Sequence, residues 1–423
     1  MYQNNTSRSG KRFSARPTHN RFASTTSGSP ASRPSFGGRS FGGSRRPTGG
    51  SRGPKPQRLD INMFINKAIV VEEAEERFVP EHAFNDFAID ERLKQNIAKK
   101  GYTVPTPIQD RTIPHILQGK DVVGIANTGT GKTAAFLVPL IQKVMTDISQ
   151  NVLIVVPTRE LALQIDQELK GFAPGLGIFS VVCVGGVGIL PQIRALRHRN
   201  QFVIGTPGRL KDLIDRGVLN LGKTNTVVLD EADRMLDMGF INDMRYLMQR
   251  MPSVRHTLFF SATLSPEIQK LVGEFLNNPV SISVKTRDTA KNVDQDIVRM
   301  KAGEDKIDAL QALLNKEGFD KVLVFGRTKH GVQKLSRELE KRGFAADSIH
   351  GDKSNFQRQA ALAKFKDGRV KILVATDVAA RGLDIPNVSH VINFDIPATY
   401  DDYVHRIGRT GRGDMLGKAL TFV

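Results

Sequence analysis

Eight consecutive residues, Ala126-Asn-Thr-Gly-Thr-Gly-Lys-Thr133, have the types and spacing of a phosphate-binding loop. They fit the pattern G-x-x-x-x-G-K-[ST], with Ala126 in place of the first glycine. In such a loop the backbone N–H groups and the positive end of the following helix dipole hold phosphates, Lys132 reaches the β and γ oxygens, and the Thr133 hydroxyl ligates Mg²⁺. The alternative is a glycine-rich turn with a solvated lysine. We expect the whole loop to bind a nucleotide: Ala126, Asn127, Thr128, Gly129, Thr130, Gly131, Lys132 and Thr133.

Two adjacent carboxylates close an apolar strand further along the chain. Asp230 and Glu231 follow Val227-Val-Leu229. One carboxylate at such a position can bind a metal ion, and its neighbour can orient or deprotonate a water molecule. Two acids at a strand end also serve as the cap of a following helix. Because a phosphate loop precedes them, we expect a metal ligand at Asp230 and a catalytic base at Glu231.

Gln109 and two arginines extend the set of residues that could act on ATP. Gln109 follows Pro105 and Pro107, which fix a rigid turn, and its amide can donate and accept together, as the N6 and N7 edge of adenine requires. Near the other end of the chain, Arg409 and Arg412 can act on a γ-phosphate as arginine fingers. Read alone, their segment is only a basic loop. We expect ATP and Mg²⁺ as cofactors.

The segments that carry this chemistry follow predicted strands that alternate with helices. Apolar runs at 121–126, 152–156, 202–204, 227–229 and 257–260 predict strands, helices are predicted after Thr133 and over 160–172, and an amphipathic helix is predicted from Phe84 through Ile97. This alternation predicts a parallel sheet with helices on both faces. Polar segments follow the carboxyl ends of the strands, where open α/β sheets bind ligands: 157–160, 206–209, 230–233 and 261–263.

A second alternating set begins after a polar stretch at 281–293, which we interpret as a linker. Its predicted strands are 322–325, 349–350, 371–374 and 390–394, with a helix over 332–342. This half contains no second phosphate loop, so any contribution to ATP must come from side chains that reach across a cleft. The predicted fold class is therefore α/β, with two tandem parallel-sheet domains over 84–280 and 294–423.

The length and composition of the chain exclude several classes of protein. The chain has 423 residues, a length that accommodates two domains and a tail. Its one cysteine, Cys183, excludes an internal disulfide framework and lies among valines, which is typical of a buried strand thiol. No apolar run approaches the roughly 20 residues of a membrane span, and the N-terminus lacks the apolar core of a signal peptide. We expect a soluble cytoplasmic protein.

Residues 1–58 carry twelve of the eighteen net positive charges, as ten Arg, two Lys and no acid. Ser, Gly, Arg, Pro and Thr dominate this segment, so it cannot bury a core and is predicted to be disordered. Its interleaved Phe, Arg and Gly suit an RNA-binding tail, in which Arg pairs with phosphate and Phe stacks on bases. A flexible solubilising leader is the alternative. Residues 59–83 form an extension for which the sequence indicates no function.

From Phe84 to Val423 the sequence resembles the DEAD-box ATP-dependent RNA helicases of superfamily 2. The resemblance rests on eight segments in the order of that family: Gln109 with its Pro-Thr-Pro-Ile lead, 126–133, 157–162, 206–209, 230–233, 261–263, 380–384 and 405–412. It implies two RecA-like domains that close over ATP and RNA and separate strands locally. It also implies catalytic roles for Lys132, Asp230, Glu231, Arg409 and Arg412.

The resemblance implies further roles at matching positions. Gln109 and an aromatic residue, Tyr102 or Phe84, would bind adenine, and Asp384 would contact the ribose. The residues expected to couple the nucleotide site to RNA are Asp233, Ser261, Thr263 and His405. The implied RNA path contacts the sugar-phosphate backbone and is therefore independent of sequence: Thr158, Arg159, Gly186, Thr206, Arg209, Arg327, Arg358 and Thr376.

The chain departs from the family pattern at two places. Asn355 stands where the family usually has Gln, and its shorter amide is expected to weaken one contact. The family has a further helix after the position of Val423, so we expect either that the sequence is a fragment or that its second domain is trimmed. Two alternative functions compete with a helicase: an RNA clamp that does not unwind duplexes, and a DNA-directed motor. We expect the protein to be a monomer.

Overall fold

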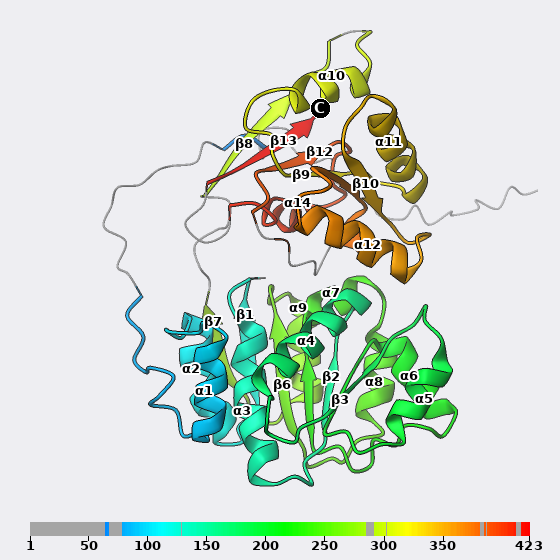
Figure 1. The fold of residues 1–423 in the computed structure, drawn as a ribbon. Coiled ribbons are helices and arrows are strands. Elements are labelled where there is room, and N and C mark those ends of the chain that lie inside the picture. The colour runs from blue at the N-terminus through cyan, green and yellow to red at the C-terminus, as the bar shows by residue number, and fades with distance from the viewer. Residues whose placement is uncertain are drawn as a thin grey trace, which may run out of the picture. The chain divides into compact units, whose positions relative to one another are not determined.

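The computed structural model describes residues 64–66, 78–127, 129–284, 292–301, 303–380, 385, 387–411 and 416–423. In these ranges the chain forms two parallel sheets, each covered by helices (Figure 1). The predicted α/β class with two tandem parallel-sheet domains is confirmed. The predicted disordered tail, 1–58, lies outside the described residues.

The first sheet contains seven parallel strands in the order β3-β4-β2-β5-β6-β1-β7. Each inner strand pairs with two neighbours, so its backbone groups are bonded on both sides, and β3 and β7 form the edges. The strands are β1 (Val122–Ala126), β2 (Val152–Val155), β3 (Ser180–Cys183), β4 (Phe202–Gly205), β5 (Thr226–Leu229), β6 (His256–Ser261) and β7 (Val280–Val284).

Helices cover both faces of this sheet. They are α1 (Glu91–Lys99), α2 (Pro107–Leu117), α3 (Lys132–Thr146), α4 (Arg159–Phe172), α5 (Ile189–Leu196), α6 (Pro207–Asp215), α7 (Ala232–Asp237), α8 (Ile241–Met248) and α9 (Pro266–Phe275). Successive side chains of a strand point to opposite faces. Val122 of β1 therefore joins the core under α1–α4, whereas Val123 joins the core under α6–α9.

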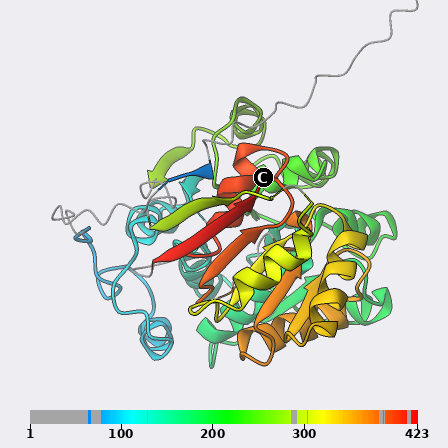
Figure 2. The same cartoon turned by 90° about the horizontal axis from the view of Figure 1, so that it is seen from above.

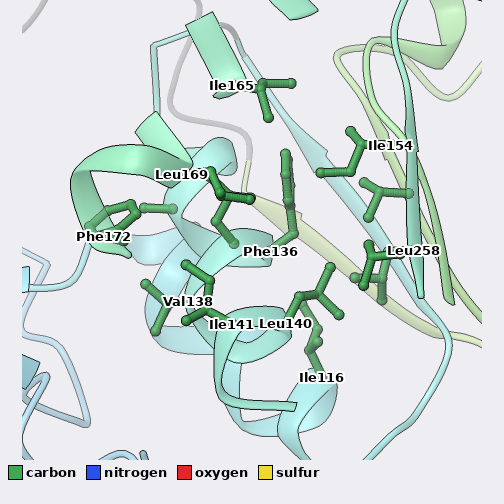
Figure 3. Packing of buried hydrophobic residues seen from close by; sticks show 14 of the residues in the cluster. Ile116, Phe136, Val138, Leu140, Ile141, Ile154, Ile165, Leu169, Phe172 and Leu258 are labelled. Atoms are coloured by element: carbon green, nitrogen blue, oxygen red, sulfur yellow. The ribbon is translucent and has the colours of Figure 1, made fainter. Parts of the chain in front are cut away.

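The core under α1–α4 fixes where the phosphate loop begins. Figure 3 shows Phe136 and Leu140 of α3 on the side of Ile154 and Leu258 of the sheet, and Ile141 belongs to the same cluster. Full burial of each such side chain stabilises the fold by about 1.5–3 kcal/mol. Because α3 is held along its length in this way, the loop that joins it to β1 is anchored at both ends.

The second sheet contains six parallel strands in the order β10-β11-β9-β12-β13-β8. They are β8 (Val293–Val298), β9 (Val322–Phe325), β10 (Ala346–Ile349), β11 (Ile372–Ala375), β12 (His390–Asn393) and β13 (Gly417–Phe422). The helices are α10 (Lys306–Leu314), α11 (Lys329–Lys341), α12 (Asn355–Lys366), α13 (Asp377–Ala380) and α14 (Tyr400–Ile407). α12 and α13 share one core cluster with the sheet, and α10 and α11 share another.

Two sequence-based boundaries are corrected by the structure. The helix predicted from Phe84 begins only at Glu91, because the Asp90 carboxylate accepts the Arg92 N–H at 2.9 Å and caps it there; the preceding residues form turns. The stretch interpreted as a linker from 281 onward begins as β7, which pairs with β1. β7 is an edge strand with Ser281 exposed and Ile282 buried, so its alternate polar residues resembled a linker.

Within the described ranges, no helix is both long enough and apolar enough to cross a bilayer.

Candidate functional site

The phosphate loop leads from β1 directly into α3. Gly129 and Gly131 have φ angles of +84° and +90°, a region that favours glycine, and Gly131 is the residue before the first turn of α3. The Lys132 side chain is buried, and its Nζ donates to the carbonyl oxygen of Ala126 at 2.8 Å. Thr130 Oγ1 donates to the Asn127 carbonyl at 2.8 Å, and Thr133 is half-buried. Thr128 lies outside the described residues.

Gln109 is tied to this loop through its side-chain amide. It is the third residue of α2 and fully buried; its Oε1 accepts the Thr106 N–H at 3.0 Å, and its Nε2 donates to the Gly131 carbonyl at 3.1 Å. Thr106 Oγ1 donates to the Thr130 carbonyl at 2.8 Å. The capping box of α2 therefore also supports the phosphate loop. An amide has two N–H groups and two lone pairs, so one of each is left for another partner.

The two aromatic candidates for the adenine site differ in exposure. Phe84 is 5% exposed and belongs to the core, where its ring lies edge-on to those of Phe87 and Tyr102, with centroids 6.0 and 6.1 Å away. Tyr102 is half-buried, and its hydroxyl donates to Glu168 Oε1 at 2.6 Å. Phe84 thus packs behind Tyr102.

The acidic pair lies at the carboxyl end of β5. Asp230 is buried, and burial, which outweighs the attraction of Lys132, raises the pKa of its carboxyl to about 6. Its Oδ1 accepts the Glu231 N–H at 2.9 Å. Glu231 has φ +51°, a left-handed conformation that costs a non-glycine residue about 1–2 kcal/mol. Its Oε2 pairs with Arg234 Nη1 at 3.0 Å, with both side chains buried, which holds the strained residue in place.

Asp233 connects this acidic segment to the end of β6. Its Oδ2 accepts the N–H groups of Ala262 and Thr263 at 2.9 and 3.0 Å and faces Thr263 Oγ1 at 3.3 Å. Ser261 is fully buried, and among the described residues its hydroxyl has no hydrogen-bond partner. Three of the four residues predicted to couple the two sites, Asp233, Ser261 and Thr263, are therefore adjacent in space.

The RNA-path candidates of the first domain gather at the carboxyl ends of β2, β3 and β4. Thr158 and Thr206 are the N-cap residues of α4 and α6. The Arg159 guanidinium lies against Gly186 (φ +72°), where a β-carbon would come within 1.7 Å of Arg159 Nη1. Arg209 Nη2 donates to the Val187 carbonyl at 3.2 Å. Only glycine permits this approach of an arginine to the loop after β3.

The candidates of the second domain occupy the matching edge of its sheet. Arg327 follows β9 and Thr376 follows β11, two strands that are paired so that Phe325 lies opposite Ala375. Arg327 is exposed, and its N–H donates to Asp395 Oδ2 at 2.8 Å. Arg358 lies in the first turn of α12 and is half-buried.

Arg406 is a residue whose role the sequence did not reveal. It lies on α14 and its side chain is buried. Its guanidinium donates to both carboxylate oxygens of Asp377, at 2.5 and 2.7 Å, and to the Asp395 carbonyl at 2.6 Å. A bidentate pair of this kind is strong and geometrically specific. It connects α13, directly after Thr376, to the helix that carries His405, which is half-buried. No feature of the sequence singled Arg406 out, because two further arginines of the same charge follow it before residue 413.

Arg409 follows α14 and is 4% exposed. Arg412 and Asp384 lie outside the described residues, so their predicted roles as arginine finger and ribose contact are not addressed by the structure. No cluster of three or more His, Cys, Asp or Glu side chains that could hold a metal occurs among the described residues. A site that uses Asp230 and Thr133 agrees with this, because Mg²⁺ is usually held by one or two protein groups together with phosphates and water.

Family models match most of the two domains. The model described as DEAD/DEAH box helicase matches residues 106–271, and the model described as helicase conserved C-terminal domain matches residues 305–414.

Curated relatives and solved structures extend the comparison. The chain is 46% identical over 343 residues to "ATP-dependent RNA helicase CshA" of Listeria monocytogenes, an alignment that covers 80% of this chain and 66% of that protein. It is 46% identical over 342 residues to "DEAD-box ATP-dependent RNA helicase CshA" of Geobacillus kaustophilus, covering 80% and 73%. The chain thus spans about two thirds of the length of the first relative.

Two solved structures share both sequence and fold with this chain. Dbp5 of S. cerevisiae, bound to RNA and ADP BeF3, is 30% identical with a TM-score of 0.72, covering 81% of this chain and 89% of that chain. Mss116, bound to ssRNA and UDP-BeF, is 31% identical with a TM-score of 0.72, covering 80% and 74%.

Proposed function

This chain belongs to the DEAD/DEAH box helicase family, and on that premise we propose that it couples ATP binding and hydrolysis to local unwinding of RNA duplexes. One observation carries the proposal: the phosphate loop, the acidic segment and the Arg159–Gly186–Arg209 cluster all lie at the carboxyl edge of one sheet. Asp233 bridges the acidic segment to Thr263, so a change at the acidic segment can reach the segment that follows β6.

In the nucleotide site we assign Lys132 to the β- and γ-phosphates and the loop amides to the phosphate oxygens. Thr133 and Asp230 would hold Mg²⁺, which when bound supplies positive charge at the transferring phosphate. The buried Asp230 fits this role, because a cation would offset the burial that now raises its pKa. Lys132 now donates to a backbone carbonyl, so the ammonium must leave that bond to reach a phosphate.

Glu231 is the proposed general base. Its carboxylate is held by Arg234 and its backbone by Asp230, so it is oriented before any water arrives. Arg409 and Arg412 are the proposed arginine fingers from the second domain.

The adenine would be bound by Gln109 with Tyr102, and the ribose by Asp384. We assign Phe84 to packing behind Tyr102 rather than to stacking on the base, since its ring is buried. Because the Gln109 amide already donates to the Gly131 carbonyl, adenine recognition and the shape of the phosphate loop are coupled through one side chain. This coupling offers a reason for adenine preference in hydrolysis as well as in binding.

RNA would be bound through its backbone by Thr158, Arg159, Gly186, Thr206 and Arg209 in one domain and Arg327, Arg358 and Thr376 in the other. His405 would join the coupling group. We further propose domain limits of 84–284 and 293–423, a tail that adds phosphate contacts, a monomer, and a cytoplasmic location.

The test measures ATP turnover with and without single-stranded RNA, and displacement of a short RNA duplex, using the purified full chain. We expect RNA to stimulate turnover, ATP to drive displacement, and Lys132→Ala to abolish both. Turnover that RNA does not stimulate would refute the proposal. Stimulated turnover without displacement would instead indicate a clamp, and equal stimulation by DNA would indicate a motor without RNA selectivity.

A further inference from the structure

A short segment of the extension before the first domain, residues 64–66, contacts the second domain through the Phe64 side chain and the Asn66 backbone. Phe64 is 1% exposed and forms a hydrophobic cluster with Val293, Tyr403, Ile407 and Ala419. Its ring meets the Tyr403 ring edge-on, with centroids 4.8 Å apart and planes at 64°. A phenylalanine that is buried this completely belongs to a packed core and not to a passing surface contact.

The backbone next to Phe64 extends the second sheet. Asn66 N–H donates to the Gln295 carbonyl at 3.1 Å, and Gln295 N–H donates to the Asn66 carbonyl at 2.8 Å, which forms an antiparallel bridge. Gln295 lies on β8, the edge strand whose other side pairs with β13. Figure 2 shows this blue segment beside the yellow-green β8. An unpaired strand edge is a site for further strand pairing, and here the chain covers part of it with its own upstream segment.

The same cluster supports α14, the helix that precedes the proposed catalytic arginine, Arg409. Tyr403 and Ile407 project from α14 onto Phe64, and the Tyr403 hydroxyl donates to Gln295 Oε1 at 2.8 Å, with both side chains buried. Phe64 and Gln295 therefore contact one side of α14. Arg406, three residues after Tyr403 and therefore its neighbour on the helix surface, is held by Asp377, and Arg409 lies two residues after the end of the helix.

We propose that residues 64–66 are an edge element of the second domain, supplied by the segment that precedes the first domain, and that Phe64 positions α14 and through it Arg409. Phe64 is a positioning residue, since it contacts the helix and not the nucleotide. The catalytic part of this proposal rests on the proposed function, whereas the docking of 64–66 does not.

The occupant of this edge is the same chain and not a second copy. Only 11 residues, 67–77, separate Asn66 from Phe78, where the described chain resumes just before the first domain. A connection of this length keeps an attached segment at an effective concentration on the order of mM, well above the μM concentration of another copy in solution.

Docking is tested by amide hydrogen exchange on the full chain. In the wild type the Gln295 amide should be protected, because its hydrogen-bond acceptor is Asn66. Phe64→Ala should remove that protection and speed exchange across residues 403–409, while Ile65→Ala, at a side chain that is 41% exposed, should leave both unchanged. Phe64→Leu should restore much of the protection, and a synthetic peptide of residues 59–68 added to the Phe64→Ala chain should restore it in trans.

Positioning is tested by RNA-stimulated turnover of the same variants. Phe64→Ala should lower kcat several-fold with the KM for ATP nearly unchanged, and Ile65→Ala should match the wild type. Unchanged Gln295 exchange in Phe64→Ala would overturn the docking, and unchanged exchange at 403–409 or unchanged kcat would overturn the positioning. Protection that rises with protein concentration would overturn the assignment to the same chain. A wild type without RNA-stimulated turnover would refute the proposed function, while exchange alone would still decide the docking of 64–66 and its effect on α14.

Discussion

Gly131→Ala should weaken ATP binding by about two to three orders of magnitude. Two terms contribute, the backbone conformation at Gly131 and the steric clash of a β-carbon with its neighbours, and they can be measured separately. The φ of +90° costs an alanine about 1–2 kcal/mol. A β-carbon at this position would lie 2.4 Å from Gln109 Nε2 and 3.0 Å from Thr106 Oγ1. The loop or Gln109 must therefore move, which breaks the buried bond from Gln109 to the Gly131 carbonyl at a cost of about 1–3 kcal/mol.

Together these terms amount to about 2–5 kcal/mol, with a midpoint of about 3.5 kcal/mol, and this free energy is needed to restore the binding geometry of the loop. The midpoint corresponds to a roughly 10²- to 10³-fold higher Kd for ATP, since every 1.4 kcal/mol is tenfold. Calorimetric titration of the full chain with ATP and Mg²⁺ measures it directly, and thermal unfolding without ATP shows how much of the cost falls on the fold itself.

A double-mutant cycle separates the steric term from the backbone term. In a Gln109→Ala background the nearest obstacle is removed and Thr106 Oγ1, at 3.0 Å, is the close neighbour that remains, so Gly131→Ala should then cost little more than the backbone term, about tenfold in Kd. Gly119→Ala is the matched control: its φ is +75°, a β-carbon there meets nothing within 4 Å, and ATP binding should be unaffected. Additive effects of the two substitutions, or wild-type affinity in Gly131→Ala, would refute the reasoning.

Four further outcomes are expected. Glu231→Gln should retain ATP and RNA binding but stop turnover, because an amide cannot accept the proton of water; rapid single-turnover hydrolysis would exclude Glu231 as the base. Arg409→Ala should lower RNA-stimulated turnover by on the order of 10³, and a wild-type rate would exclude an arginine finger there. Deleting residues 1–58 should make the slope of log K for RNA against log salt concentration shallower by about 0.7 for each phosphate that the tail neutralises, while kcat at saturating RNA is retained. An unchanged slope would indicate that the tail is only a flexible leader. Burial lowers the pKa of His390 to about 4, so between about pH 6.5 and pH 4 the unfolded chain binds a proton at this residue that the folded chain does not. The free energy of unfolding of the second domain should therefore fall as the pH drops from about 6.5 toward 4. Denaturant titrations should show a smaller fall for His390→Gln than for the wild type, and equal falls would contradict the prediction.

Much of the site could be predicted from the sequence because the residues that carry its chemistry lie in short contiguous segments. A phosphate loop needs glycine at particular positions within eight residues, and Gly129 and Gly131 have the positive φ angles that this implies. The carboxyl ends of parallel strands meet at one edge of a sheet, so the segments after β2, β4, β5 and β6 could be expected to lie together. Apolar runs at the inner strands predicted the strands themselves, since both of their faces are buried.

Edges and helix starts were predicted less well. β7 and β8 lie at sheet edges, where alternate residues are polar, so their composition resembles that of a linker. The start of α1 depends on which acceptor satisfies its first N–H groups, and Asp90 does so six residues after the helix was predicted to begin.

The sequence by itself determined the local chemistry: which segment can hold phosphates, which carboxylates can act beside it, and which strands deliver them to one edge. Only the tertiary structure decided the contacts between residues far apart in the chain. Gln109 donates to a carbonyl 22 residues away, Arg406 pairs with Asp377 29 residues away, and Phe64 packs on Tyr403 across the whole first domain. No periodicity or spacing encodes such pairs, because each depends on how several packed elements bring two side chains together, and the free energy of that packing is shared over the whole core.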